Sequence, residues 1–259
     1  MSPAVFAVGD FFWIAGVLSE FDYCYAILFN IKMECEMIMD KNQQGIELMQ
    51  QGKYEEAAKV FNEAIEENPN EPVAYINFGN VLTAVGETDK AVKFYRKAIE
   101  LDENAAAAYY SLGNLYYESD SKLVEAKDMF EKAIRLGLEN SDAYFMLGLT
   151  LMALDQPKLA MPYLQRTVEL SPEDVDARFQ YALCLANAEL YDELINQLNL
   201  VVEQDPGHAD AYYNLGVAFA GYREDAQAAI AYFDKALEAQ PDHMLAAHGK
   251  KLMEEMNAE

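Results

Sequence analysis

The sequence predicts an all-α, right-handed solenoid of six helix-turn-helix repeats that is closed by a C-terminal capping helix. A pattern of small and large residues, clearest in residues 72–105, returns at nearly constant spacing along the chain, and such a period is the signature of a repeat array. Tyr75 falls on one face of a first helix and Tyr95 on one face of a second. Gly79 and Ala91 are small, as two closely crossing helices require.

The period of about 34 residues resembles that of the tetratricopeptide (TPR) family. That family has an aromatic residue at position 4, Leu at 7, Gly at 8, Ala at 20 and 27, and a second aromatic residue at 24, and most repeats of this chain match most of these positions. The resemblance implies that the first helices of successive repeats line a concave wall. The predicted repeats are 38–71, 72–105, 106–140, 141–174, 175–208 and 209–243, and the predicted capping helix is 244–259.

Charge and cysteine content narrow the class of partner. The 259 residues include 19 basic and 44 acidic side chains, which gives a formal net charge of −25. Binding to nucleic acid and to anionic lipid depends on Lys and Arg, so this balance argues against both and favours basic or neutral partners. The alternative is an acidic surface that only keeps the protein in solution. Cys24, Cys35 and Cys184 show no disulfide pattern, which predicts a reducing cytoplasm.

Residues 1–37 differ in composition from the repeats. They hold two apolar runs, and no basic stretch precedes the first run as a secretory signal requires. Each run is too short to cross a bilayer alone, and Glu20 and Asp22 lie between them, which disfavours a membrane span. Four interpretations stay open: an extension translated from an early start codon, a hairpin over the open end of the array, a segment that fills the groove, and an anchor at residues 11–31.

Repeat five departs most from the pattern. Arg178 replaces the first aromatic residue, Ala182 replaces the Gly, and Leu194 replaces the small residue at the helix crossing. We therefore expect its two helices to lie further apart than those of the other repeats. Arg178 is expected to form an ion pair with the nearby Asp174 or Asp176.

The concave wall is predicted to hold the binding site. Position 5 is aromatic in repeats three to six and predicts a stacked ladder, while amides at positions 6 and 9 offer a donor and an acceptor to the main chain of an extended peptide. An acidic row at position 2 (Asp142, Asp176, Asp210) suits a basic end of that peptide. The alternative is that the aromatic residues cover neighbouring helices and that Asn serves solubility. The predicted groove residues are Asn77, Asn80, Tyr110, Asn114, Tyr117, Phe145, Phe179, Gln180, Tyr213 and Asn214.

No catalytic residue, metal site or cofactor is predicted. The sequence has no Gly-rich phosphate loop, no HExxH, no paired cysteines at zinc spacing and no nucleophile elbow. His208 and His243 lie in QDPGH and QPDH, which are typical of turns between repeats. Cys184 falls in the packing layer and is expected to be inert. TPR proteins that bind the carboxylate end of chaperones carry Lys and Arg in the groove, and the absence of both from repeats one to four disfavours that function.

A closer resemblance rests on irregular stretches of the sequence. These are EAKDMFEKAIRLGLEN, QPKLAMPYLQRTVEL, ARFQYALCLAN, EQDPGHADAYYNLGV and QPDHMLAAHGKKL, and they resemble the YrrB-type TPR proteins of Bacillus-like bacteria over residues 45–253. The resemblance implies a cytosolic superhelix without catalytic activity, and an adaptor role among RNA-sulfuration, RNA-processing and aminoacyl-tRNA synthetase components.

The sequence as a whole predicts a cytoplasmic scaffold for protein interactions. Its expected partner is a protein or peptide segment with apolar side chains and a basic end, without direct contact to nucleic acid. The alternative function is a membrane-tethered assembly factor that is anchored through residues 11–31. The oligomeric state is left open.

Overall fold

A computed structural model describes residues 41–257 as a chain of helices joined by short turns. The prediction for residues 1–37 therefore lies outside the described part of the chain, as does the start of repeat one. The helices are α2 (Lys41–Gln50), α3 (Tyr54–Glu67), α4 (Pro72–Ala84), α5 (Thr88–Leu101), α6 (Ala106–Tyr117), the 3-10 helix η2 (Asp120–Lys122), α7 (Leu123–Arg135), α8 (Ser141–Ala153), α9 (Pro157–Leu170), α10 (Val175–Asn187), α11 (Tyr191–Gln204), α12 (Ala209–Gly221), α13 (Ala226–Ala239) and α14 (Met244–Asn257).

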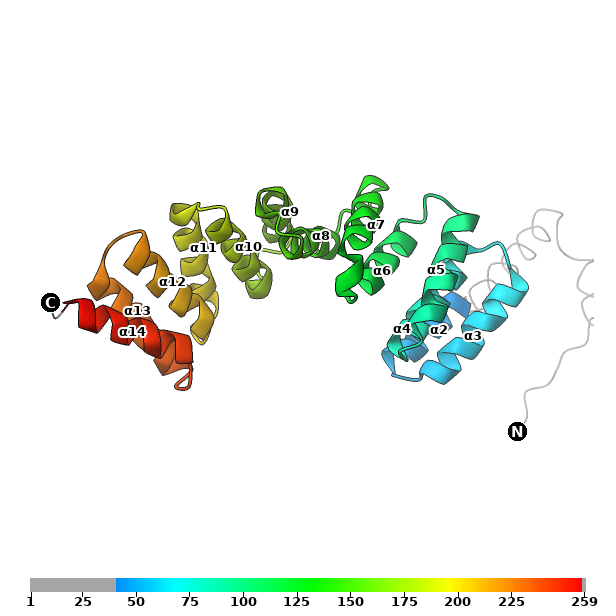
Figure 1. The fold of residues 1–259 in the computed structure, drawn as a ribbon. Helices are drawn as coiled ribbons and strands as arrows, with labels where there is room; N and C mark the ends of the chain where they lie inside the picture. The colour runs from blue at the N-terminus through cyan, green and yellow to red at the C-terminus, as the bar shows by residue number, and fades with distance from the viewer. Residues whose placement is uncertain (1–40, 258–259) are drawn as a thin grey trace, which may run out of the picture.

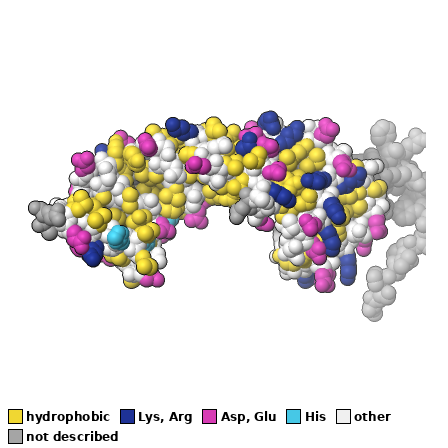
Figure 2. All heavy atoms as spheres, in the orientation of Figure 1, with side chains coloured by type: hydrophobic (Ala, Val, Ile, Leu, Met, Phe, Trp, Pro, Cys, Tyr) yellow, Lys and Arg dark blue, Asp and Glu magenta, His cyan; other side chains and the backbone are white. Residues whose placement is uncertain are grey.

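The helices form an elongated arc in which each one packs mainly on its neighbours in sequence (Figure 1). Even-numbered helices α2 to α12 are the first helices of repeats one to six, and odd-numbered helices are the second ones. Successive first helices also contact each other, and the approach is least close between α10 and α12. The expected all-α, right-handed solenoid is confirmed, and the space-filling view shows it hollowed on one side, below α8 (Figure 2).

Small residues make the close helix crossings possible. A Cβ atom added at Gly79 would lie only 2.5 Å from Cε1 of Tyr95, and one added at Gly113 would lie 2.7 Å from Cε1 of Phe130. Tyr95 and Phe130 are almost fully buried, because each ring fills the space that the missing side chain leaves. The glycine at position 8 and the large residue at position 24 therefore determine how closely the two helices of a repeat pack.

The turn inside every repeat except repeat three contains a residue in the left-handed conformation. Gly52 and Gly86 take it with φ of 74° and 79° in repeats one and two. Repeats four and five place Asp155 and Glu189 there instead, with φ of 57° and 62°. A residue with a Cβ atom adopts this conformation at a cost of about 1–2 kcal/mol, so these two turns are strained relative to the glycine turns.

Side chains in the turns between repeats cap the following helices. Asn140 and Asp174 accept hydrogen bonds from the backbone N–H groups of Ala143 and Ala177. His208 and His243 do the same through Nδ1 and cap α12 and α14, over 3.2 Å and 3.1 Å. These bonds satisfy amide groups that have no partner within the helix, and they confirm that QDPGH and QPDH are turn sequences.

The C-terminal helix α14 covers the end of the last repeat and leaves several apolar side chains exposed. Ala246 and Met253 are buried, and Phe233 packs where Gly249 has no side chain. The outer face carries four exposed apolar side chains: Met244, Leu245, Leu252 and Met256. Within residues 41–257 no helix has the length and apolar character needed to span a membrane.

Candidate functional site

The ten predicted groove residues lie on five first helices. Each is partly buried, which is the state expected of side chains that line a hollow and belong neither to the core nor to the free surface. Their placement on the helices is Asn77 and Asn80 on α4, Tyr110, Asn114 and Tyr117 on α6, Phe145 on α8, Phe179 and Gln180 on α10, and Tyr213 and Asn214 on α12.

The carboxamide of Asn80 is already used inside the protein. Its Oδ1 accepts a hydrogen bond of 2.8 Å from the Tyr95 hydroxyl and one of 3.3 Å from Oγ of Ser111. Tyr95 is nearly buried, and burial raises the pKa of its hydroxyl, so it stays protonated and keeps donating. Asn80 therefore ties three helices together, and only its Nδ2 lacks a partner within residues 41–257.

Asn114 occupies the same position one repeat later and has lost both donors. Phe130 stands where Tyr95 stands in repeat two, and Met146 stands where Ser111 stands. Oδ1 of Asn114 is consequently buried without a hydrogen bond, the one side-chain atom in that state within the described chain. Such an atom costs about 1–3 kcal/mol of stability.

The remaining amides differ in how far they are used. Nδ2 of Asn77 donates to Oδ1 of Asn42 over 3.2 Å, which joins α4 to α2. Nδ2 of Asn214 donates to the carbonyl of Asp210 over 2.8 Å and leaves its Oδ1 without a partner in the described chain. Gln180 makes no hydrogen bond within residues 41–257, so both ends of its amide are available to a ligand.

The aromatic residues do not stack on one another, which corrects the expectation of a ladder. Phe179 lies against the ring of His208, with centroids 4.5 Å apart, and Tyr213 packs on Phe233 and His243 at 6.0 Å and 5.2 Å. Tyr110 packs on Phe130 at 5.8 Å. Burial raises the pKa of the Tyr110 hydroxyl, an effect that the neighbouring Asn114 amide partly offsets. Each ring is thus held by its own repeat or by the turn that follows.

Arg178 does not form the expected ion pair with Asp174 or Asp176. Its side chain is only 7% exposed and donates to neutral acceptors: Nη2 to the Pro172 carbonyl at 2.7 Å, Nη1 to Gln197 at 3.0 Å and Nε to Gln204 at 3.3 Å. The guanidinium fork fits three acceptors at once, which explains why an arginine replaces the aromatic residue here. Arg178 is a buried structural residue and does not face the groove.

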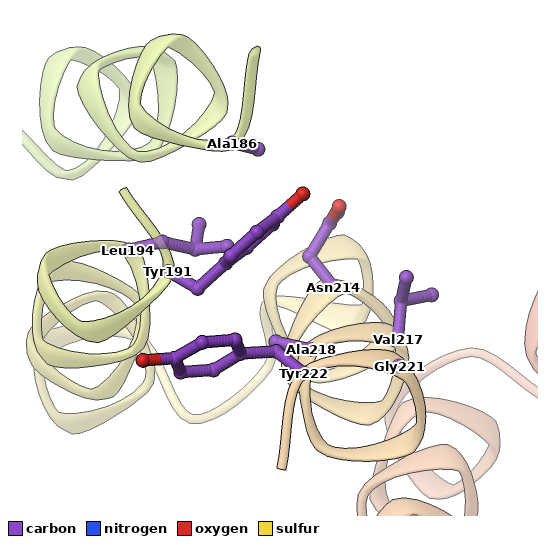
Figure 3. A pocket seen from close by; sticks show the side chains of 8 residues that line it. All are labelled: Ala186, Tyr191, Leu194, Asn214, Val217, Ala218, Gly221 and Tyr222. Carbon is purple, nitrogen blue, oxygen red and sulfur yellow. The ribbon is translucent and has the colours of Figure 1, made fainter. Parts of the chain in front are cut away.

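A cavity of about 320 Å³, which the sequence did not reveal, lies at the junction of repeats five and six (Figure 3). It forms where α10 and α12 approach each other least. The helices of repeat five pack less closely than those of repeats two, three, four and six, as its bulky Leu194 predicted. The lining residues are Ala186, Tyr191, Leu194, Asn214, Val217, Ala218, Gly221 and Tyr222.

The acidic row has one member with an internal partner. Asp210 Oδ1 lies 3.1 Å from Nε2 of His243, and because Nδ1 of that ring accepts from Ala246, Nε2 is the donor. Asp142 and Asp176 are exposed and have no ion pair within the described chain.

Other chemistry is sparse in the described residues. They contain no group of His, Cys, Asp and Glu side chains that could hold a metal ion. Cys184 is fully buried, its Sγ donates to the Pro157 carbonyl at 3.2 Å, and burial raises the pKa of the thiol to about 11. A buried, protonated thiol is a poor nucleophile, which agrees with the structural role expected of Cys184.

Comparison with protein families decides the class. Sequence models of the family described as TPR repeat match residues 45–86 and 79–120, and those described as tetratricopeptide repeat match residues 121–172, 145–207 and 195–243. The chain belongs to the tetratricopeptide repeat family.

Two curated proteins match parts of the chain. Protein O-mannosyl-transferase TMTC3 of Homo sapiens is 28% identical over 196 residues, which are 74% of this chain and 18% of that protein. TPR repeat-containing protein YrrB of Bacillus subtilis (strain 168) is 55% identical over 39 residues, which are 15% of this chain and 19% of that protein. Each match spans less than a fifth of the relative's own length.

Solved TPR structures resemble the chain over a longer stretch. The crystal structure of YrrB, described as a TPR protein with an unusual peptide-binding site, has a TM-score of 0.72 and 55% identity, and the match covers 75% of this chain and 99% of that one. A crystal structure of MamA has a TM-score of 0.62 and 25% identity, with 67% of this chain and 93% of that one covered. TPR repeats serve as scaffolds for protein interactions, and this chain carries the same architecture.

Proposed function

We propose that this protein is a non-enzymatic cytoplasmic adaptor, which holds an extended segment of a partner protein along the first helices of its repeats. The observation that carries the proposal is the buried, unpartnered Oδ1 of Asn114. An amide with an unused acceptor gains more from a hydrogen bond to a ligand than a satisfied one does, because the free protein already bears the cost of the missing bond.

The other groove amides support the same function. Gln180 offers both a donor and an acceptor, Asn214 offers its Oδ1, and Asn80 offers its Nδ2. These groups are spread from repeat two to repeat six, so they match the repeating N–H and C=O groups of an extended chain without requiring a particular sequence. The partly buried aromatic residues between them provide rigid apolar contact at small entropic cost.

Similarity to a known protein supports a peptide as the ligand, and the negative charge of the chain supports a peptide with basic residues. YrrB, which is 55% identical over 75% of this chain, is described as having a peptide-binding site. The net charge of −25 and the exposed Asp142 and Asp176 favour a segment that carries basic residues. The YrrB-type resemblance makes RNA-sulfuration and RNA-processing enzymes the first partners to test.

Affinity capture from a native lysate tests this function. The full chain, an Asn114→Ala/Gln180→Ala variant and an Asn62→Ala/Asn199→Ala control are compared by quantitative mass spectrometry. The control changes two exposed asparagines on second helices, α3 and α11. We expect the groove variant to lose proteins that the full chain and the control capture equally. Equal capture by all three proteins would show that the partner binds elsewhere or that no partner exists.

A further inference from the structure

We propose that the cavity between repeats five and six is the anchor subsite of the groove: it accepts one apolar side chain of the bound segment, next to basic residues of that segment. The inference rests on the proposed function, because five of the eight lining residues lie on the first helices α10 and α12, along which the bound segment is proposed to run. It goes beyond that function by assigning the selection of the partner to this cavity, through burial of an apolar side chain that has basic neighbours.

The cavity has the size and walls of a side-chain pocket. Its volume of about 320 Å³ is at the small end of the range for ligand pockets, which suits a single large aliphatic or aromatic side chain. Leu194 and Ala218 form apolar walls and are each 4% exposed, while Val217 at the mouth is 46% exposed. Burial of an apolar side chain against such walls is the main source of affinity in peptide recognition.

Repeat five combines a short side chain and a bulky one at the cavity. Position 12 of the first helix is Tyr117 in repeat three and Met152 in repeat four, but Ala186 in repeat five. Leu194 stands at position 20, where the other repeats have Ala, and α10 and α12 approach each other least. A small residue at the mouth and a large one at the crossing together open the space.

Two polar groups stand at the mouth without internal partners. The Tyr191 hydroxyl makes no hydrogen bond within residues 41–257, and the oxygen of Asn214 points away from its helix (Figure 3). The Tyr222 hydroxyl, in contrast, donates to Asp192 at 2.9 Å, and its ring lies 5.0 Å from that of Tyr191. One wall is therefore fixed by internal bonds, and the other offers a donor and an acceptor to the main chain of a ligand.

The charges around the cavity define the neighbours of the anchor. Five acidic side chains lie in the two turns that border it and in the first turn of α11: Glu189, Asp192, Glu193, Glu224 and Asp225. The one basic residue there, Arg223, is bound to Asp192 at 2.7 Å. On the face shown in Figure 2, Lys and Arg gather over α3 to α7 and are few over α10 to α13. A Lys or Arg of the ligand, next to the apolar side chain in the cavity, would lie in the negative electrostatic potential of these acidic residues.

The chain's own apolar N-terminal run is a poorer occupant. Residues 11–31 contain Glu20 and Asp22 and no basic residue, so the same charges would repel them. A basic partner segment is therefore the occupant that the cavity fits best.

A random peptide library displayed on phage and selected on the full chain tests the inference. We expect the enriched peptides to share one Leu, Ile, Met or Phe with Lys or Arg within two residues of it. Affinities of synthetic enriched peptides are then measured by calorimetry. Ala186→Met, which restores the side chain of repeat four, should weaken them by about tenfold or more, or about 1.4 kcal/mol. Ala220→Met, the same substitution at position 12 of repeat six, lies outside the cavity and should leave affinity unchanged.

A second variant covers the case in which Ala186→Met disturbs the fold. Val217→Asp changes an exposed side chain at the mouth and should also weaken the peptides by about tenfold, since it places a charge beside the anchor. Peptides that lose affinity in Asn114→Ala/Gln180→Ala but not in Ala186→Met or Val217→Asp would overturn the anchor subsite and leave the groove function standing. An acidic apolar consensus would assign the cavity to residues 11–31 and overturn the proposal. Failure to enrich any peptide would overturn both.

Discussion

The Tyr95 hydroxyl donates to Oδ1 of Asn80 over 2.8 Å, and this bond distinguishes Asn80 from Asn114, which we propose binds the ligand. Asn114 has the same place in the next repeat, but Phe130 lies opposite it and has no hydroxyl to donate. The two repeats share the same close packing of ring on glycine, so they differ at this point mainly in hydrogen bonding. Four predictions use this difference and other local contacts.

Replacing Tyr95 with Phe should remove the stronger donor to Asn80 and leave Ser111 as its one donor. Ring packing against Gly79 is unchanged, so the loss reflects the hydrogen bonds of the hydroxyl, which joins Asn80 at 2.8 Å and Oγ1 of Thr83 at 3.0 Å. We expect the free energy of unfolding to fall by about 1 kcal/mol, measured from urea denaturation followed by circular dichroism. The reverse substitution, Phe130→Tyr, should raise stability by a similar amount and weaken peptide binding, because Asn114 would gain an internal donor. Phe130→Tyr that is destabilising would contradict this account of Asn114.

Gly216 and Gly221 lie on the same helix, α12, and should respond to alanine in opposite directions. A Cβ atom at Gly216 would lie 2.5 Å from Cε1 of Phe233, so Gly216→Ala should cost about 2 kcal/mol or more. Nothing lies within 4 Å of a Cβ atom at Gly221, where alanine should be neutral or stabilise the helix by up to about 1 kcal/mol. Thermal unfolding of the two variants measures both effects, and equal losses would show that the crossing does not depend on a missing side chain.

Arg178→Lys should be destabilising although it keeps the charge. The three acceptors of Arg178 are bound by different nitrogens of the guanidinium group, and a single ammonium group cannot reach all of them. We expect a loss of about 2 kcal/mol in urea denaturation. Arg223→Lys is the matched control, because the side chain of Arg223 is 46% exposed and its pair with Asp192 contributes little. If both changes have the same effect, the buried network does not stabilise repeat five.

The buried thiol of Cys184 predicts a dependence on high pH. Its pKa rises from 9.0 in the unfolded chain to about 11 in the folded one, so the thiol is neutral in both states below 9. Above 9 the unfolded chain loses this proton first, and the stability that comes from the protonated thiol is lost as pH rises toward 11. The free energy of unfolding should fall more steeply between these values than it does in Cys184→Ala. Parallel pH profiles of the two proteins would contradict the buried state of the thiol.

The repeats and their helix faces could be predicted because the contacts that define them are local and recur. The glycine at position 8 meets the large residue at position 24 within one helix pair, so a single repeat such as that with Gly79 and Tyr95 contains all the information. The periodic pattern then repeats this information along the chain. The placement of His208 and His243 in turns between repeats was also a local feature and is confirmed, whereas the sequence did not predict that both rings cap the following helix.

Features that depend on the next repeat were harder to predict. Oδ1 of Asn80 is bound partly by Ser111, which lies in the next repeat. Arg178 finds its partners nearer by, but two of them lie on the second helix of its own repeat, α11, and none is among the nearest carboxylates. The cavity needs α10, α11 and α12 together. Its signals were present in the sequence as a small Ala186 and a large Leu194, but neither residue alone defines a pocket.

The arc has a mechanical consequence because each helix pair touches only its neighbours. Small rotations at successive junctions add up, so the distance between the two ends of the molecule can vary at a small energetic cost. A segment bound from α4 to α12 restrains every junction between them at once. Its binding would reduce the variation of the end-to-end distance without a hinge motion. A narrower distribution of this distance would therefore indicate an occupied groove.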